Sequence, residues 1–219
     1  MSSGHRCCPA SIMRLPSHLY AMIDTSGGHE PVALARQLLD SGARVLQLRL
    51  KDHSSRHLLA IATVIADLCR QRGALFIVND RADIAKLAGA DGVHAGQDDL
   101  PLAAARAIVG ERMIVGVSTH NVEQARAAEA GGADYIGFGA IYSGGLKNVI
   151  NARGLDRLRM VRAAVKLPIV AIGGITEATV PGVLAAGADA VAIITDIVRA
   201  PDLPAKVRSL LALAPPDRS

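Results

Sequence analysis

Short apolar runs alternate with longer amphipathic stretches along nearly the whole chain. Eight runs have the length and aliphatic content of buried strands, namely LYAMID, RVLQLRL, ALFIVND, DGVHAG, MIVGVST, YIGFGAI, PIVAIGG and AVAIITD. The stretches between them carry apolar residues at helical spacing, as in PVALARQLLDSGA, HLLAIATVIADLCRQRG, VEQARAAEAGGA and TVPGVLAAGADA. This regular alternation predicts an α/β fold with parallel strands.

Small tripeptides with a central glycine precede several of these strands. They are SGA, AGA, GGA and AGA at 41–43, 88–90, 131–133 and 186–188, and glycine at such a position is typical of a helix C-terminus. No linker or change of composition interrupts the pattern. We therefore predict a single-domain (β/α)8 TIM barrel over residues 17–215, with a doubly wound sheet as the lesser alternative, and interpret residues 1–16 as a disordered or loosely attached tail.

Composition refines this picture in two ways. Half of the residues are hydrophobic, but only 2% are aromatic, so the core must be built from aliphatic side chains, as in parallel α/β proteins. The net charge of +4 comes from 24 basic and 20 acidic residues, and weakly favours anionic small-molecule ligands. Because there is no basic run and few aromatic residues for base stacking, we expect no nucleic-acid partner.

Cysteine usage and the N-terminus bear on location. The chain has three cysteines, Cys7, Cys8 and Cys69, without a metal-binding spacing, which favours free thiols in a reducing compartment. The N-terminal stretch lacks the apolar core of a signal peptide, and no apolar run is long enough to cross a bilayer. We therefore expect a cytoplasmic protein without membrane association.

The second apolar run places polar residues on one of its two faces. In VLQLRLKD the leucines alternate with Gln47, Arg49 and Lys51. Both faces of a barrel strand are covered, so leucines packed against helices would direct the polar residues into the barrel mouth. An exposed edge strand is the alternative. Buried charges need partners, and we therefore favour an anion site here.

Acidic residues follow the third and fourth runs. Asn79 and Asp80 end one of them, whereas His94, Asp98 and Asp99 follow the next. Each aspartate taken alone is most simply a helix cap, and His94 is most simply a packed core histidine. Two carboxylates at neighbouring strand ends beside basic groups, however, suit a Mg²⁺ ion that bridges phosphate oxygens.

Two later segments carry weaker signals. Ser118 lies just past the fifth run, where Asn121 and Gln124 have the spacing of a capping box. Gly173 and Gly174 end the seventh run ahead of a short helix, a common phosphate cradle of backbone N–H groups in barrels of this type.

Together these segments resemble the thiamine phosphate synthase family. The resemblance runs in order through QLRLK, VNDR, DGVHAGQDD, GVSTHN, GADYIGFGAI, PIVAIGGIT and GADAVAIITDI, over nearly the whole chain. It implies a cytoplasmic transferase of thiamine biosynthesis that joins hydroxymethylpyrimidine diphosphate to hydroxyethylthiazole phosphate by a dissociative substitution. The products are thiamine phosphate and pyrophosphate, and Mg²⁺ is required.

The resemblance also implies residue roles. Mg²⁺ would be held by Asp80 and Asp99. The implied catalytic residues are Arg49, Lys51, Ser118 and Lys147. The implied substrate-binding residues include the same four and five more, so the set is Gln47, Arg49, Lys51, Asn79, Ser118, Lys147, Gly174, Ile194 and Thr195. Of these, Gly174 and Thr195 match the family's cradle for the thiazole phosphate.

The chain departs from the family pattern in two places. The family reads Gly-Pro-(apolar)-(aromatic)-Pro-Thr-x-Thr-Lys where this chain has GAIYSGGLK, so both prolines and both threonines are missing although Lys147 stays. Asp196 stands where the family commonly has a small residue. Two alternatives therefore stay open: a thiazole tautomerase with His120 as the proton-transfer residue, and a non-catalytic thiamine-pathway homologue. A homo-oligomer is also left open.

Overall fold

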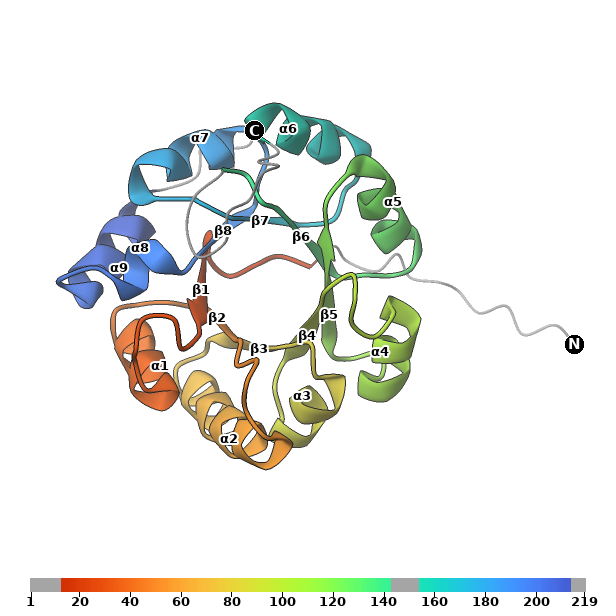
Figure 1. Cartoon of the computed structure of the whole chain (residues 1–219). Helices are drawn as coiled ribbons and strands as arrows, with labels where there is room; N and C mark the ends of the chain where they lie inside the picture. The colour runs from red at the N-terminus through yellow and green to blue at the C-terminus, as the bar shows by residue number, and fades with distance from the viewer. Residues whose placement is uncertain (1–12, 143–153, 214–219) are drawn as a thin grey trace, which may run out of the picture.

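The eight predicted strands form a closed barrel in which every neighbouring pair is parallel (Figure 1). A computed structural model describes residues 13–142 and 154–213. Closure between the first and last strands confirms the TIM barrel and rules out the doubly wound sheet. The strands are β1 Leu19–Ile23, β2 Val45–Leu48, β3 Leu75–Asn79, β4 Gly92–Ala95, β5 Ile114–Thr119, β6 Tyr135–Gly139, β7 Ile169–Ile172 and β8 Ala190–Ile193.

Helices surround the barrel on its outside (Figure 1). Those of the described residues are α1 Pro31–Asp40, α2 Ser55–Gln71, α3 Ala82–Ala88, α4 Leu102–Val109, α5 Val122–Ala130, α6 Gly154–Ala164, α7 Val180–Ala185, α8 Thr195–Val198 and α9 Leu203–Ala212, with a 3-10 helix η1 at Glu177–Thr179. The predicted helix-terminal glycines adopt positive φ angles that favour glycine, at Gly42, Gly89, Gly132 and Gly187.

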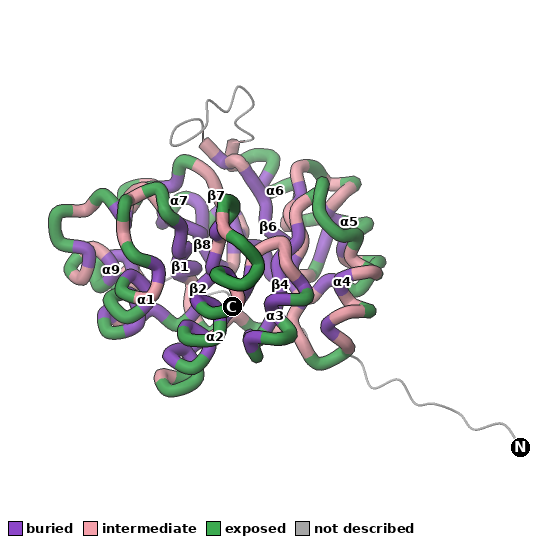
Figure 2. Tube along the Cα trace, turned by 60° about the horizontal axis from the view of Figure 1, so that its bottom comes forward, coloured by how far each residue is buried: buried purple, intermediate pink, exposed green. Residues whose placement is uncertain are grey.

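Two hydrophobic clusters separate the inside of the barrel from its outside. The larger cluster lies between strands and helices and includes Leu46, Leu48 and Leu50, as the alternation in the second strand predicts. The smaller cluster consists of Tyr20, Met22, Val45, Ile77, Tyr135, Val170, Ala190 and Ala192, whose side chains fill the barrel. Figure 2 shows the buried strands inside and exposed positions along the helices.

The ends of the described chain bear on several predictions. Met13 and Leu15 are partly buried against the inner cluster, whereas residues 1–12 and 214–219 lie outside the described residues, so the predicted boundaries at 16 and 215 stay predictions. Cys69 is a buried free cysteine, as expected, and Cys7 and Cys8 fall outside the described part. Within that part, no helix is long and apolar enough to cross a membrane.

Candidate active site

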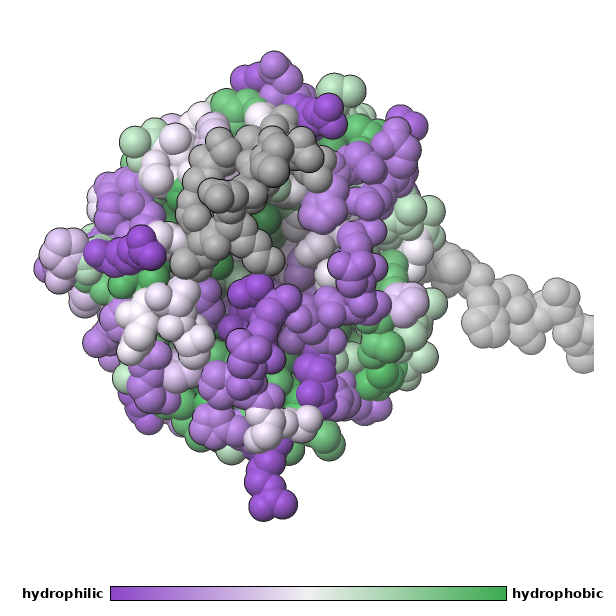
Figure 3. Space-filling model, in the orientation of Figure 1, coloured by the Kyte–Doolittle hydropathy of each residue, from purple (hydrophilic) through white to green (hydrophobic). Residues whose placement is uncertain are grey.

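A cavity of ≈ 130 Å³ opens inside the barrel among the strand ends. Its walls contain both apolar and polar residues, namely Tyr20, Met22, Gln47, Arg49, Asn79, His94, Ser118, Tyr135, Gly137, Val170, Ile172 and Ala192. The view down the barrel shows hydrophilic side chains gathered around its centre (Figure 3). The cavity therefore brings together four of the predicted site residues, Gln47, Arg49, Asn79 and Ser118.

The polar face of the second strand points into the barrel as predicted. Gln47 is only 4% exposed, and its Nε2 donates to Asn79 Oδ1 over 2.7 Å. This bond leaves the carbonyl oxygen of Gln47 and the amide N–H groups of Asn79 for a ligand. The strand is shorter than predicted, because β2 ends at Leu48. Half-buried Arg49 still lines the cavity, whereas Lys51 is exposed in the bend beyond it.

The two carboxylates predicted to bind a metal lie close together. Burial and then the neighbouring Asp99 together raise the pKa of Asp80 to about 6, although the cationic Lys51 and Arg49 oppose the rise. Asp80 has a φ angle of 64°, a left-handed conformation that aspartate and asparagine tolerate better than most residues. One carboxylate oxygen of Asp99 accepts a hydrogen bond from the backbone N–H of Gly96 over 2.8 Å.

The simpler explanation for these aspartates, helix capping, is not what the structure shows. Helix α3 has Arg81 at its N-cap and α4 has Pro101, and neither cap has a side-chain hydrogen bond. Asp80 and Asp99 are therefore not used as helix caps. Capping is confirmed in the next unit, where Asn121 Oδ1 accepts from the backbone N–H of Gln124 over 2.8 Å.

A chain of four polar side chains crosses the barrel and lines the cavity. The Tyr20 hydroxyl lies 2.8 Å from the Tyr135 hydroxyl, which lies 3.0 Å from Nδ1 of His94. Nε2 of His94 lies 2.9 Å from the Ser118 hydroxyl. The sequence prediction of a packed core histidine is correct in burial, but it missed both tyrosines and the link to Ser118. Their only sequence signal is an inward-facing position in β1 and β6.

Backbone packing explains the glycines that end β7. A Cβ atom on Gly173 would lie 2.5 Å from Ala140 Cβ, and one on Gly174 would lie 2.9 Å from Tyr142 Cβ. Both glycines also have positive φ angles, of 99° and 63°. The segment after β6 thus packs directly on the end of β7, where Tyr142 N–H donates to the Gly173 carbonyl over 3.0 Å.

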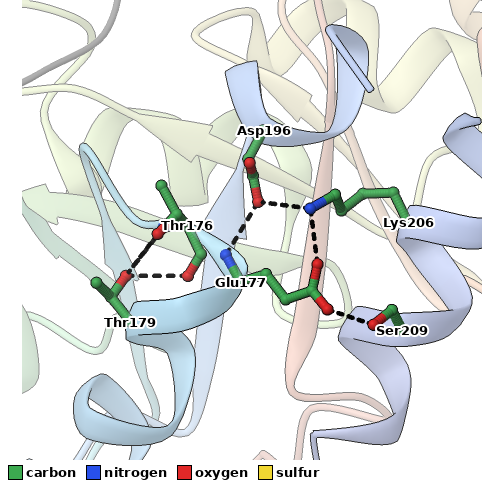
Figure 4. Close-up of polar contacts among 6 residues, drawn as sticks. All are labelled: Thr176, Glu177, Thr179, Asp196, Lys206 and Ser209. Carbon is green, nitrogen blue, oxygen red and sulfur yellow. Dashed lines mark hydrogen bonds and ion pairs between the residues drawn. The ribbon is translucent and has the colours of Figure 1, made fainter. Parts of the chain in front are cut away.

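The end of β8 carries the remaining predicted residues. Ile194 occupies the N-cap of α8, Thr195 is its first residue, and both are half-buried. Asp196 follows, and its Oδ2 accepts from the backbone N–H of Glu177 over 2.9 Å and lies 3.4 Å from Lys206 Nζ. Figure 4 shows this cluster, in which Lys206 also pairs with Glu177. The unexpected Asp196 therefore ties α8 to η1 and α9.

Some predicted residues are not placed at the cavity. Lys147 and the preceding SGGL lie outside the described residues. The ring of His120 is half-buried with Nδ1 2.9 Å from the Gly139 carbonyl oxygen, and it does not line the cavity. Among residues 13–142 and 154–213, no cluster of three or more His, Cys, Asp or Glu side chains is arranged to hold a metal. The described carboxylates would therefore hold an ion that keeps several waters or ligand oxygens.

The closed barrel, with a polar cavity and paired carboxylates among its strand ends, has the architecture of (β/α)8-barrel enzymes, whose active sites lie at the carboxyl ends of the strands. Residues 19–197 match the family model described as thiamine monophosphate synthase. The chain therefore belongs to this family, and the resemblance recognised from sequence is confirmed.

Named relatives agree with this assignment. The chain is 46% identical to the thiamine-phosphate synthase of Moorella thermoacetica over 195 residues, which cover 88% of this chain and 93% of that protein. It is also 46% identical to the thiamine-phosphate synthase of Methanospirillum hungatei over 198 residues, 89% and 96% of the two chains. The solved thiamine phosphate pyrophosphorylase of Pyrococcus furiosus superposes with a TM-score of 0.82 at 34% identity, over 90% of this chain and 95% of that one. The predicted transferase of thiamine biosynthesis is thus confirmed.

Proposed function

We propose that this chain condenses hydroxymethylpyrimidine diphosphate with hydroxyethylthiazole phosphate, which gives thiamine phosphate and pyrophosphate. The observation that carries the proposal is the cavity in which Gln47, Arg49, Asn79 and Ser118 converge beside the Asp80–Asp99 pair. Family membership supports the same reaction. A heteroaromatic ring fits the mixed apolar and amide lining, and its diphosphate fits the cations.

The chain's polar groups divide into ring-binding and anion-binding sets. The carbonyl oxygen of Gln47, left over from its bond to Asn79, is an acceptor for an amino group on the pyrimidine. Asn79 then directs its amide N–H groups to the diphosphate, together with Arg49 and the Ser118 hydroxyl. Cations around a departing pyrophosphate stabilise the charge that develops as the carbon–oxygen bond breaks. Lys51 and Lys147 complete this set in the proposal.

The donor set also fits Mg²⁺. Asp80 and Asp99 are two neighbouring carboxylates, and the raised pKa of Asp80 comes first from burial and then from the effect of Asp99. Mg²⁺ is typically held by one or two carboxylates plus substrate phosphates and several waters. When bound there, it would neutralise negative charge on the diphosphate. Lys51 and Arg49 already lower the pKa of Asp80 and so favour its ionised, ligand-competent form.

The thiazole phosphate is proposed to bind at the ends of β7 and β8. Gly174, Ile194 and Thr195 lie there, and Gly174 is exposed, with a positive φ angle of 63°. The hydrogen bond from Glu177 N–H to Asp196 Oδ2 holds these two strand ends together. A cradle of backbone N–H groups binds a phosphate well because its donors are fixed in advance.

A direct assay tests the function. The full chain is mixed with both substrates and Mg²⁺, and pyrophosphate and thiamine phosphate are measured, with each substrate omitted in turn as a control. Formation of both products is expected. Interconversion of thiazole phosphate tautomers without ligation would support the tautomerase alternative, which the position of His120 outside the cavity lining disfavours. Binding of both substrates without either reaction would support the non-catalytic alternative.

The proposal includes the physiological setting. A cytoplasmic enzyme that takes small phosphorylated substrates, without nucleic acid or membrane, fits the mixed surface charge and the free thiol of Cys69. Assembly into a homo-oligomer stays open.

A further inference from the structure

The side chains of Tyr20, Tyr135, His94 and Ser118, here called the buried relay, connect β1, β6, β4 and β5 through the barrel. Its three contacts are 2.8, 3.0 and 2.9 Å long, and both tyrosines are 1% exposed. The neighbouring strands make room for it. A Cβ on Gly116 would lie 2.1 Å from Tyr135 Cζ, and one on Gly137 would lie 3.0 Å from His94 Cε1.

Burial disfavours the charged form of each member of the relay. His94 is 8% exposed, and among the described residues its two ring nitrogens contact only the hydroxyls of Tyr135 and Ser118, so no carboxylate stabilises a second ring proton. Burial likewise raises the pKa of Tyr20 and that of Tyr135 above the ordinary value. A neutral imidazole has one N–H donor and one acceptor nitrogen. The relay therefore holds four protons for three contacts, and one proton must point elsewhere.

The surroundings decide which proton is left over. Tyr20 and Tyr135 also line the cavity, but both are only 1% exposed, so a spare proton on either hydroxyl would be a buried donor without a partner among the described residues, which is unfavourable. Ser118 is half-buried at the cavity, where water or a ligand accepts a hydrogen bond. The favoured direction thus runs from Tyr20 to Tyr135 to Nδ1 of His94, and from Nε2–H of His94 to Ser118.

We infer that His94 carries its proton on Nε2 and donates it to Ser118 Oγ, so that the Ser118 hydroxyl is turned into the cavity as a donor to a phosphate oxygen. His94, Tyr135 and Tyr20 are positioning residues that act through Ser118. The inference rests on the proposed function for the identity of the ligand, a diphosphate, but not for the direction of the relay. In the reverse direction the Ser118 hydroxyl would donate its proton to Nε2 of His94. Only the lone pairs of its oxygen would then face the cavity, and they would repel an anion.

The direction of the relay is tested without any reaction. Nitrogen-detected NMR of histidine side chains in the full chain at neutral pH reports which ring nitrogen carries the proton. The His94 signals are identified by their loss in His94→Gln or by through-space contacts to Tyr135. A proton on Nε2 is expected, and a proton on Nδ1 would overturn the inference.

A double-mutant cycle tests whether the relay acts through Ser118. Tyr135→Phe keeps the ring but removes the hydroxyl that fixes Nδ1 as an acceptor, so turnover should fall about tenfold. In a Ser118→Ala background the same change should lower turnover by less than about twofold, because the effects of two residues that act through one contact do not add. Equal losses in both backgrounds would overturn the inference and leave Tyr135 a structural residue. Tyr20 is one contact farther from Ser118, so Tyr20→Phe should lower turnover less than Tyr135→Phe does.

Binding of inorganic pyrophosphate separates this inference from the proposed function. Calorimetry should show weaker binding to Ser118→Ala and to Tyr135→Phe than to the unaltered chain. If the unaltered chain forms no thiamine phosphate, the proposed function fails, while the NMR and pyrophosphate results still decide the relay. If the chain is active but the cycle is additive, only the relay fails. Thermal unfolding of each variant checks that it is folded.

Discussion

The carboxyl group of Asp99, in the loop after β4, lies near enough to that of Asp80, directly after β3, to add to the effect of burial in raising the pKa of Asp80. Two like charges so close together destabilise the fold at neutral pH unless a cation or a proton joins them. We therefore expect the pair to bind a cation rather than to stabilise the fold by itself.

The first prediction is that Mg²⁺ stabilises the folded chain through this pair. Mg²⁺ at a hundredfold excess over the dissociation constant should raise the free energy of unfolding by about 2.7 kcal/mol. Asp80→Asn should lose most of that response, and asparagine is preferred to alanine because it tolerates the φ angle of 64°. Thermal melts with and without Mg²⁺ measure the effect. Asp98→Asn, an exposed neighbour, is the control, and an equal response in both variants would contradict the assignment.

The second prediction concerns Arg49 in the cavity wall. No ion pair involves it within residues 13–142 and 154–213, so Arg49→Met should change the free energy of unfolding by less than about 0.5 kcal/mol. Turnover should nevertheless fall by about tenfold or more, because a charged hydrogen bond to the diphosphate is lost. Steady-state kinetics measures the change in turnover, and urea unfolding measures the change in the free energy of unfolding. Arg126→Met, on the exposed side of α5, removes the same charge without touching the cavity. A destabilised but fully active Arg49→Met would make Arg49 a structural residue.

Sequence alone could predict the barrel because its signals are local. The glycines at helix ends and the aliphatic runs each require only neighbours in the chain, and all eight strands follow from them. Alternation likewise placed Gln47 and Arg49 on the inner face. The same alternation also predicts a second strand that reaches Lys51, whereas β2 ends at Leu48. The residues of the bend after the strand continue the alternation of polar and apolar side chains, so the sequence pattern does not mark the end of the strand.

The missed features depend on contacts between distant segments. Tyr20 and Tyr135 meet across the barrel, 115 residues apart in the chain, and only the closure and tilt of the sheet bring them together. Asp196 was recognised as unusual, but its partner Lys206 lies on a different helix, and a single sequence gives no sign of that pairing. Contacts between side chains of distant segments depend on how the elements are arranged in three dimensions, so they cannot be predicted from hydrophobic periodicity.

The third prediction is a pH dependence of stability that comes from His94. Its pKa is lowered in the fold to about 4 from an ordinary 6.5, so the unfolded chain binds more protons between these values. Stability due to His94 is therefore complete above pH 6.5 and is lost as the pH falls through about 4, up to about 3 kcal/mol at about 1.4 kcal/mol per pKa unit.

Chemical unfolding measured from pH 7.5 down to pH 4.5 tests this point. The unaltered chain should lose stability more steeply than His94→Gln, whose side chain does not titrate there. Parallel curves would mean that His94 keeps its ordinary pKa in the fold.

The fourth prediction concerns the cluster of Asp196, Glu177 and Lys206 (Figure 4). Asp196→Ala removes the acceptor of the Glu177 backbone N–H and should lower the free energy of unfolding by about 1 kcal/mol. Asp196→Asn keeps a carbonyl acceptor in place, and Lys206 keeps Glu177 as a partner at 2.6 Å, so the asparagine variant should lose less. If the cluster also holds the ends of β7 and β8 in position, the alanine variant should raise the KM for thiazole phosphate more than the KM for the pyrimidine diphosphate. Urea unfolding and kinetics with each substrate varied in turn measure both effects, and equal behaviour of the two variants would show that the backbone N–H bond contributes nothing.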